Sequence, residues 1–289
     1  MKEIVKEKIA SLLVGDEEIQ SVEQLGGMTN QNYLVKTSSN QYIVKFFGKG
    51  TDKLIDRQNE KYNLELLKDL KLDVENYHFD IEAGIKVNQY IENAETLDST
   101  IIKTKFEKIA PILQTIHASG KELKGEFAPF EEIKKYESLI QDEISYPNYE
   151  AVRKSVISLK DQLEEIGIDK KSCHIDLVPE NFIEAPDGHL YLIDWEYSSM
   201  NDPMWDLAAL FLESEFTPEE EEEFLAYYES EQTPVSREKI RIYKILQDII
   251  WSLWTIYKEE NGADFGDYGV TRYQRAVKGL TYYGGSDEK

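Results

Sequence analysis

Short runs of alternating apolar and polar residues fill the first ninety positions of the chain, and a helical spacing of apolar residues replaces them afterwards. A period of two is typical of half-buried strands, and a period of 3.6 is typical of helices. The early pattern predicts five strands, at residues 21–25, 32–37, 41–47, 76–81 and 84–91. The last four form two hairpins, which turn at residues 38–40 and 82–84. Residues 52–70 place apolar residues and the acid Glu60 at helical spacing, which predicts one inserted helix.

After residue 97 the helical spacing dominates. It predicts helices at residues 105–119, 130–144, 148–166, 203–214, 236–260 and 268–279. Thr217 and Pro218, followed by five glutamates, add a further helix start, because threonine caps, proline suits the first turn and acids favour the positive end of the helix dipole. Between residues 171 and 197, short apolar runs flank a turn at residues 186–188, which predicts a small hairpin.

Charge and cysteine content narrow the function classes. The 289 residues hold 33 Lys and Arg against 56 Asp and Glu, a formal net charge of −23. Such a field repels nucleic acids and anionic membrane surfaces, so neither is an expected partner, and it attracts small cations. One cysteine, Cys173, excludes an internal disulfide and is expected to be a buried apolar residue. Residues 1–15 lack a signal-peptide pattern and no apolar stretch approaches a membrane span, so a cytoplasmic protein is expected.

The strongest chemical signal is His174-Ile-Asp-Leu-Val-Pro-Glu-Asn181, followed by Asp194 at the end of the predicted small hairpin. Asp176 precedes Asn181 by five residues, which is the spacing between the aspartate and asparagine of the kinase catalytic loop. Phosphoryl transfer needs a carboxylate that accepts a hydrogen bond from the attacking hydroxyl, and oxygen ligands for Mg²⁺. Taken singly, each of these residues would be expected to cap a turn or end a strand; together they predict a phosphotransferase.

These residues, with Ile193-Asp-Trp-Glu-Tyr197, resemble the motifs of the choline/ethanolamine kinases and their aminoglycoside phosphotransferase relatives. Residues 193–208 resemble the bacterial LicA-type choline kinases in particular. The resemblance implies an α+β, protein-kinase-like bilobal fold, with a five-stranded antiparallel sheet plus helix in a small N-terminal lobe and a larger, mainly helical C-terminal lobe. It also implies that residues 1–91 bind the nucleotide and that residues 92–289 hold the catalytic loop and a choline pocket.

Carried over residue by residue, the resemblance implies Asp176 as the catalytic base and Asn181 and Asp194 as Mg²⁺ ligands. Lys45 would contact the α and β phosphates of ATP, with Glu60 as its partner. Asp206 would support the catalytic loop by hydrogen bonding. The remaining implied nucleotide contacts are the turn residues Gly27, Thr29 and Asn30 and the adenine-binding segment Gln89, Tyr90 and Ile91.

Two departures from protein kinases affect the substrate class. No G-x-G-x-x-G is present, so the turn at Gly26-Gly27 must cover the phosphates with fewer glycines and with help from side-chain hydroxyls or amides. The triplet at Asp194 is Asp-Trp-Glu, and no Ala-Pro-Glu segment follows it. A protein substrate is therefore not expected.

Aromatic residues favour choline. Trp251 and Trp254 lie three residues apart on one predicted helix face. Periodicity alone favours core packing for both, but the resemblance places them around a quaternary ammonium, whose charge aromatic faces attract. The same resemblance adds Tyr197, Trp205 and Tyr268, with Glu213 as a distant countercharge. His117 is expected to be a hydrogen-bonded core residue.

The leading hypothesis is an ATP- and Mg²⁺-dependent choline kinase. An ethanolamine kinase or an aminoglycoside phosphotransferase is an alternative of the same class, although an aminoglycoside site should be rich in carboxylates rather than rings. A kinase fold that binds without catalysis is the alternative from another class, and the complete set of Lys45, Asp176, Asn181 and Asp194 argues against it.

Overall fold

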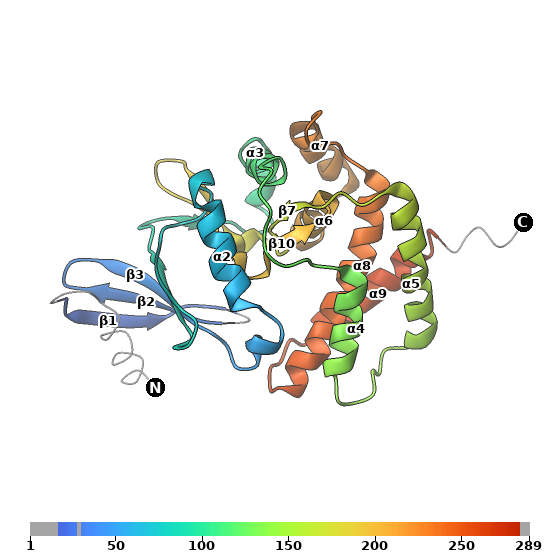
Figure 1. The fold of residues 1–289 in the computed structure, drawn as a ribbon, viewed down its shortest axis with the longest axis horizontal. Coiled ribbons are helices and arrows are strands. Elements are labelled where there is room, and N and C mark those ends of the chain that lie inside the picture. Colours follow the sequence, from blue (N-terminus) through green and yellow to red (C-terminus); the bar gives the residue numbers. More distant parts are fainter. Residues whose placement is uncertain (1–16, 28–29, 284–289) are drawn as a thin grey trace, which may run out of the picture. The chain divides into compact units, whose positions relative to one another are not determined.

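A computed structural model describes residues 17–27 and 30–283 (Figure 1). The chain divides into two compact units: the first contains the residues up to Leu97 together with Glu180–Glu196, and the second contains Asp98–Pro179 and the residues from Tyr197 on. Residues 1–15, which lack a signal-peptide pattern, lie outside the described residues. The predicted division after Ile91 differs from these units, because a hairpin late in the chain packs with the first unit.

The first unit is built on a five-stranded antiparallel sheet in the order β1-β2-β3-β5-β4. Its first three strands lie side by side in Figure 1. Its strands are β1 (Ile19–Gln24), β2 (Gln31–Thr37), β3 (Gln41–Phe46), β4 (Asn76–Asp80) and β5 (Ile85–Gln89). Val35, Val44 and Val87 form the buried centre of one sheet face with Tyr33 and Ile85. All five strands and both hairpins follow the alternation of the sequence, so this part of the prediction is confirmed.

The inserted helix is shorter than its sequence pattern. Residues 52–70 form a 3-10 turn (Thr51–Lys53), helix α2 (Arg57–Leu67) and a second 3-10 turn (Lys68–Leu70). Asp56 starts α2, because its carboxylate accepts hydrogen bonds from the backbone N–H groups of Gln58 and Asn59. Helical periodicity continues across this cap, which explains why the sequence predicted one longer helix.

The small hairpin predicted around residues 186–188 is present in the first unit. Strands β8 (Phe182–Glu184) and β9 (Leu190–Leu192) pair antiparallel, and β6 (Glu95–Thr96) adds to β8. Gly188 closes the turn in the left-handed region, at φ 86°. Leu97 N–H donates to the carbonyl of Phe182, and Leu192 N–H donates to that of Leu72, so the hairpin is anchored at both ends.

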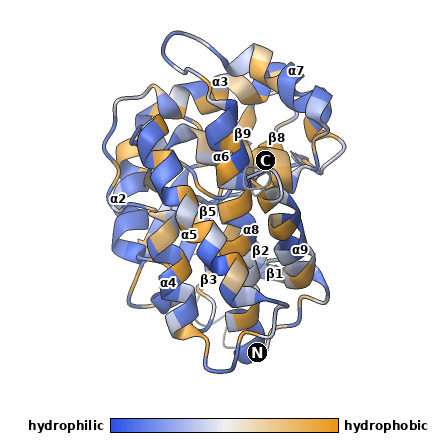
Figure 2. Cartoon of the chain, turned by 90° about the vertical axis from the view of Figure 1, so that its right-hand side faces the viewer, coloured by the Kyte–Doolittle hydropathy of each residue, from blue (hydrophilic) through white to orange (hydrophobic). Residues whose placement is uncertain are grey.

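Helices make up most of the second unit. Its elements are α3 (Phe106–His117), α4 (Pro129–Leu139), α5 (Tyr149–Ile166), α6 (Pro203–Glu213), α7 (Pro218–Tyr228), α8 (Arg237–Glu260), α9 (Tyr268–Leu280) and the two-stranded pair β7 (Lys171–Cys173) and β10 (Ser199–Asn201). Helix α8 packs against α4, α5, α6 and α9 and is its central element (Figure 1). Hydrophobic residues concentrate along α6 and α8, whereas α5 is hydrophilic over much of its length (Figure 2).

All seven helices start within two residues of the predicted positions. The main difference is α4, which ends at Leu139 rather than near residue 144, because Ile140 takes an extended conformation. Short strands such as β6, β7 and β10 were not predicted, since two or three residues are too few to show a period. No helix in the described part of the chain has the length and apolar character to cross a membrane.

Helix α7 provides a test of local stability. Thr217 Oγ1 accepts from the N–H of Glu220, and the carboxylate of Glu220 accepts from the N–H of Thr217, which forms a capping box. Thr217→Ala should remove about 1 kcal/mol of stability, equivalent to a fall in Tm of about 2–4 °C. Thr217→Ser should keep the cap and retain the wild-type Tm. Ser155→Ala on the exposed face of α5 serves as the control, and equal melting of the Ala and Ser variants at position 217 would contradict the assignment.

Candidate functional site

The β8–β9 hairpin brings the two predicted metal ligands together. Asn181 directly precedes β8, and Asp194 lies two residues after β9 ends. Ile193 N–H donates to the carbonyl of Asn181 at 2.8 Å, so the ends of the hairpin lie side by side. Asp194 adopts a left-handed backbone conformation, with φ 66°, which is not compatible with an extended strand.

Asn181 and Asp194 together supply an amide oxygen and a carboxylate. Both are hard oxygen donors of the kind that Mg²⁺ prefers. Asn181 is buried, whereas the side chain of Asp194 is 27% exposed and can be reached from solvent. The chemistry of this donor pair therefore fits a magnesium ion.

Lys45 on β3 is paired with Asp194. The Nζ atom donates to Asp194 Oδ1 at 2.5 Å, and the lysine is 5% exposed. Burial by itself would lower the pKa of Lys45, but the negative charges of Asp194, Glu196 and Glu60 outweigh it and raise the pKa above its ordinary value. Lys45 is therefore a permanent cation beside the proposed metal ligand.

The predicted pairing of Lys45 with Glu60 is wrong in this structure. Glu60 accepts from Lys86 Nζ at 3.0 Å and from Arg57 Nη1 at 2.6 Å. Lys86 on β5 is the register partner of Lys45 on β3, so two buried lysines lie side by side and Glu60 pairs with the second of them. Lys86 was missed because a lysine in an alternating strand is usually exposed.

The Gly26-Gly27 turn is held by asparagine side chains. A Cβ atom on Gly27 would lie 2.5 Å from the carbonyl oxygen of Asn30 and 2.8 Å from Asn32 Nδ2, so only glycine fits there. Asn32 Nδ2 donates to the carbonyl of Gly26. Asn30 is buried, and its side chain bonds to Glu196, Arg57 and the N–H of Gly48. Thr29 lies outside the described residues, so its predicted nucleotide contact stays a prediction.

The predicted adenine segment immediately follows the buried part of β5. Gln89 is the last residue of the strand, and Tyr90 and Ile91 follow it, all three half-buried. Gln89 Oε1 accepts from the N–H of Glu75, so this side chain is used to join the two strands of the hairpin. A role in adenine binding would therefore depend on backbone groups here.

Asp73 is a carboxylate that the sequence analysis missed. It lies in the segment before β4 and follows Leu72, whose carbonyl accepts a hydrogen bond from the N–H of Leu192 in β9. Burial raises its pKa to about 7, while Lys86 and a hydrogen bond from the N–H of Val74 oppose the shift. One acid among many in an acidic chain carries no sequence signal, and only the tertiary structure shows that this one is desolvated.

In the second unit, the catalytic-loop sequence begins with a strained residue. Ile175 has φ 77°, a left-handed conformation that is costly for a β-branched side chain. Asp206 on α6 compensates, because its two carboxylate oxygens accept from the N–H groups of His174 and Ile175, each at 2.8 Å. The predicted support of the loop by Asp206 is confirmed. The half-buried Asp176 comes directly after this fixed pair.

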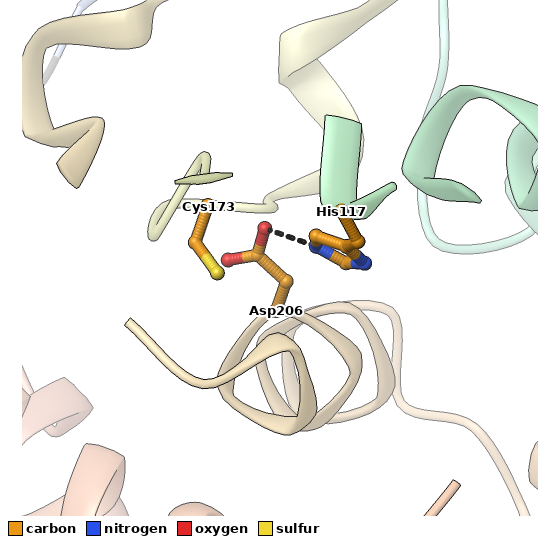
Figure 3. Close-up of side chains that lie close together, drawn as sticks. All are labelled: His117, Cys173 and Asp206. Carbon is orange, nitrogen blue, oxygen red and sulfur yellow. Dashed lines mark hydrogen bonds and ion pairs between the residues drawn. The ribbon is translucent and has the colours of Figure 1, made fainter. Parts of the chain in front are cut away.

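Asp206 also belongs to a buried cluster with His117 and Cys173 (Figure 3). It is the one group of three His, Cys, Asp or Glu side chains in residues 17–27 and 30–283 whose ligand atoms all lie within 4.8 Å of one another. His117 Nε2 bonds to Asp206 at 3.0 Å, and its Nδ1 bonds to the hydroxyl of Tyr228 at 2.7 Å. Burial raises the pKa of the Cys173 thiol well above its usual value. Hydrogen bonds already use these atoms, so the cluster is structural, as expected for His117 and Cys173.

The predicted choline residues form one connected group of rings. Tyr197 lies edge-on to Trp251 with ring centroids 5.7 Å apart, and Trp251 lies edge-on to Trp254 at 6.4 Å. Phe265, which the sequence analysis missed, connects Trp254 to Tyr268. Its ring centroid lies 4.9 Å from that of Trp254 and 6.4 Å from that of Tyr268. Trp251 and Trp254 are 8% and 5% exposed, so most of each indole packs inside the unit.

Asp176 acts electrostatically on the same aromatic group. Burial is the main cause of the raised pKa of Tyr268, and the negative charges of Glu213 and Asp176 add to it. The pKa of the buried Tyr136 is likewise raised, chiefly by burial, with a contribution from Asp176. The predicted base therefore lies within electrostatic range of the rings.

Trp205 differs from the other predicted rings. It is fully buried, its indole N–H donates to the carbonyl of Ile175, and it packs against Phe127 and Tyr243. These contacts give it a core position that supports the catalytic loop. We therefore leave Trp205 out of the proposed choline contacts.

Glu213, the predicted countercharge, already has a cationic partner. It accepts a hydrogen bond from Arg272, and Arg272 Nη1 also donates to Asp248 at 3.1 Å. The guanidinium lies 4.6 Å from the centre of the Tyr268 ring. The charge of Glu213 is thus balanced inside the unit. Arg272 lies four residues after Tyr268 on α9, and no sequence pattern pointed to it.

The chain is similar to known proteins over most of its length. The profile of the family described as choline/ethanolamine kinase matches residues 22–277. A crystal structure of the choline kinase LicA from Streptococcus pneumoniae is 78% identical, with a TM-score of 0.94, and the match covers 98% of this chain and 99% of that one. A structure of LicA in complex with AMP is also 78% identical, with a TM-score of 0.92, covering 97% of this chain and 98% of that one.

More distant matches extend the picture. A protein LicA from Haemophilus influenzae is 31% identical over 265 residues, which are 88% of this chain and 78% of the relative. The AMP complex of a spectinomycin phosphotransferase is 14% identical with a TM-score of 0.61 and covers 98% of this chain and 99% of that one. This last likeness concerns the fold alone, and it confirms the expected α+β, protein-kinase-like class.

Asp73 predicts a pH dependence of stability. The ordinary pKa of an aspartate is 3.8, and burial raises the pKa of Asp73 to about 7 in this fold. As the pH rises, the unfolded state therefore loses its proton before the folded state does. Asp73 thus lowers the free energy of unfolding increasingly from about pH 4 to about pH 7. Asp73→Asn should therefore raise Tm by several degrees at pH 8 and by less at pH 5. Thermal melts at both pH values measure this, with the exposed Asp52→Asn as the control. A gain that is the same at both pH values would contradict the raised pKa.

Proposed function

Since this chain belongs to the choline/ethanolamine kinase family, we propose that it transfers the γ-phosphoryl group of ATP to the hydroxyl of choline. The observation that carries the proposal is the 78% identity, over nearly the whole chain, to a protein described as a choline kinase. The site residues support it, because Lys45, Asp176, Asn181 and Asp194 are all present and their local environments suit phosphoryl transfer. ATP supply and the lone cysteine favour a cytoplasmic location.

The nucleotide belongs to the first unit in this proposal. Lys45, kept cationic by its acidic neighbours, would donate to the α and β phosphate oxygens. The turn at Gly27 and Asn30 would cover the phosphates, and Gln89, Tyr90 and Ile91 would contact the adenine. Asn181 and Asp194 would hold Mg²⁺, which when bound neutralises negative charge on the phosphates.

Asp176 would act on the substrate hydroxyl. Its carboxylate would accept the hydrogen bond of the choline hydroxyl and orient an oxygen lone pair toward the γ-phosphorus. It would receive the hydroxyl proton as the new O–P bond forms, while the bond between the γ-phosphorus and the β–γ bridging oxygen breaks and ADP leaves. The hydrogen bonds from His174 and Ile175 to Asp206 hold the backbone before Asp176 in one conformation. A fixed backbone limits the motion of this carboxylate, which favours the reactive geometry.

The choline ammonium would contact the group of Tyr197, Trp251, Trp254 and Tyr268. A trimethylammonium has no N–H to donate and is cheaply desolvated, so electron-rich ring faces hold it well. The net charge of −23 would further attract the cation to the protein. Since Glu213 is balanced by Arg272, we assign it an indirect electrostatic contribution rather than a contact.

A coupled assay for ADP release tests the activity. With ATP and Mg²⁺, choline should give turnover well above the background, ethanolamine less, and an aminoglycoside none. Greater turnover with ethanolamine or with the aminoglycoside would reassign the substrate within the kinase class. Nucleotide binding without turnover on any of the three would overturn the enzymatic proposal in favour of a binding module.

Asp176→Ala should lower kcat by roughly 10²–10⁴-fold, because the general base is lost. The ATP KM should change little, since Asp176 lies outside the nucleotide-binding unit. Steady-state kinetics and a thermal melt measure both effects, with the exposed Asp161→Ala on α5 as the matched control. A folded Asp176→Ala variant with near-normal kcat would show that another group activates the hydroxyl.

Trp251→Ala or Trp254→Ala should raise the choline KM by one to two orders of magnitude. A desolvated cation–π contact contributes about 2 kcal/mol, which corresponds to roughly 30-fold in affinity. The ATP KM should barely move.

Core packing alone predicts a different result for these two variants: a lower Tm and a proportionate loss of every activity, ATP binding included. Phe224→Leu, which alters a fully buried ring elsewhere in the second unit, is the control for destabilisation without a choline effect. A choline KM that stays at the wild-type value in both Trp variants would return the two indoles to the core.

A further inference from the structure

Arg57, the first residue of α2, is the centre of a buried network in the first unit. Its Nη1 donates to Glu60 at 2.6 Å and to Glu196 at 2.8 Å, and its Nη2 donates to Asn30 Oδ1 at 3.1 Å. Asn30 Nδ2 in turn donates to the same oxygen of Glu196, at 2.7 Å. The four side chains are between 1% and 7% exposed. The network is therefore desolvated and formed from three distant segments of the chain.

The geometry requires an arginine. A guanidinium offers donors in a planar fork, so it can bond to two carboxylates and an amide at once, whereas an ammonium is a compact point charge. The guanidinium of Arg57 lies over the ring of Phe47, with Cζ 4.0 Å from the ring centre, and this contact fixes the plane of the donors. Burial would lower the pKa of Arg57, but Glu196 and Glu60 raise it above its usual value, so the cation persists.

The network leads directly to two elements of the proposed nucleotide site. Asn30 is a predicted phosphate contact, and both the Nδ2 and the Oδ1 of its side-chain amide have hydrogen-bond partners. Glu196 lies two residues after Asp194, the proposed metal ligand and partner of Lys45. The sequence lacks the glycines of a kinase phosphate loop. Side-chain amides instead hold the described backbone nearby: Asn32 bonds to the carbonyl of Gly26, and Asn30 bonds to the N–H of Gly48. Arg57 in turn fixes the amide of Asn30.

We propose that Arg57 is a positioning residue for the triphosphate: it fixes Asn30, a predicted phosphate contact, and through Glu196 it fixes the segment that carries Asp194. This inference rests on the proposed nucleotide-binding role of the first unit. Glu60 needs Arg57 less, because Lys86 also pairs with it. The bond of Arg57 to Glu60 thus serves stability, whereas its bond to Asn30 serves nucleotide binding.

The test compares ATP with AMP, in the absence of choline, by calorimetric titration of the full-length protein. Arg57→Met should weaken ATP binding about 10- to 100-fold and AMP binding less than about threefold, because AMP lacks the β and γ phosphates. Arg57→Lys should recover most of the lost Tm by restoring the charge between Glu60 and Glu196. It should not recover ATP affinity, because a point donor cannot also hold Asn30.

A double-mutant cycle identifies the route. If Arg57 acts through Asn30, then Arg57→Met should add little to the loss of ATP affinity already caused by Asn30→Ala, whereas independent effects would add. Lys239→Met is the matched control, because Lys239 is 5% exposed and paired with the buried Asp202 at 2.8 Å in the second unit. It should lower Tm without changing ATP affinity.

Equal losses of ATP and AMP affinity, additive effects with Asn30→Ala, or full recovery of ATP affinity by Arg57→Lys would each overturn the proposal. If Arg57→Met does not fold, Arg57→Lys and Asn30→Ala still decide between these outcomes. Choline turnover by the wild-type protein is measured separately. A failure of the choline proposal would leave normal ATP titrations, whereas a failure of the Arg57 proposal would appear in the titrations alone.

Discussion

The buried carboxylate of Asp206 is the constraint on which the catalytic-loop sequence depends. Its two oxygens accept from consecutive backbone N–H groups, at His174 and Ile175, and His117 Nε2 bonds to Oδ2 of the same carboxylate. Without these bonds, Ile175 would leave its left-handed conformation, which is unfavourable for a β-branched residue. The strain is therefore held in place by helix α6, and the residue that follows is Asp176. A rigid position for one carboxylate is what an in-line transfer needs.

In the first unit, buried ion pairs rather than backbone hydrogen bonds hold the site residues in position. Two buried lysines and a buried arginine lie among the carboxylates of Glu60, Asp194 and Glu196, and each cation has at least one close acidic partner. Removing one member would leave an uncompensated buried charge, so such a network tolerates few arrangements. Because it tolerates few arrangements, the network holds Asn30 and Asp194 in fixed positions.

Much of the architecture follows from local pattern. Strands β1 to β5 and helices α3 to α9 lie where the alternation, caps and turns predicted them, because each element buries one face and its sequence must repeat accordingly. The kinase-like motif likewise follows from spacing, since Asn181 and Asp194 flank a short hairpin whose pairing is local. The exceptions are α2, which starts late at the cap Asp56, and strands of two or three residues.

The sequence by itself determined the order of the elements, the phosphotransferase motif and the aromatic residues offered to a cation. The tertiary structure decided which charges are paired: Lys45 with Asp194, Glu60 with Lys86 and Arg57, and Glu213 with Arg272. It also decided that Trp205 is a core residue and that Asp73 is desolvated. Local patterns record which face of an element is buried, but the partner of a buried charge comes from a distant segment, and in a chain with 56 acids no spacing rule selects it.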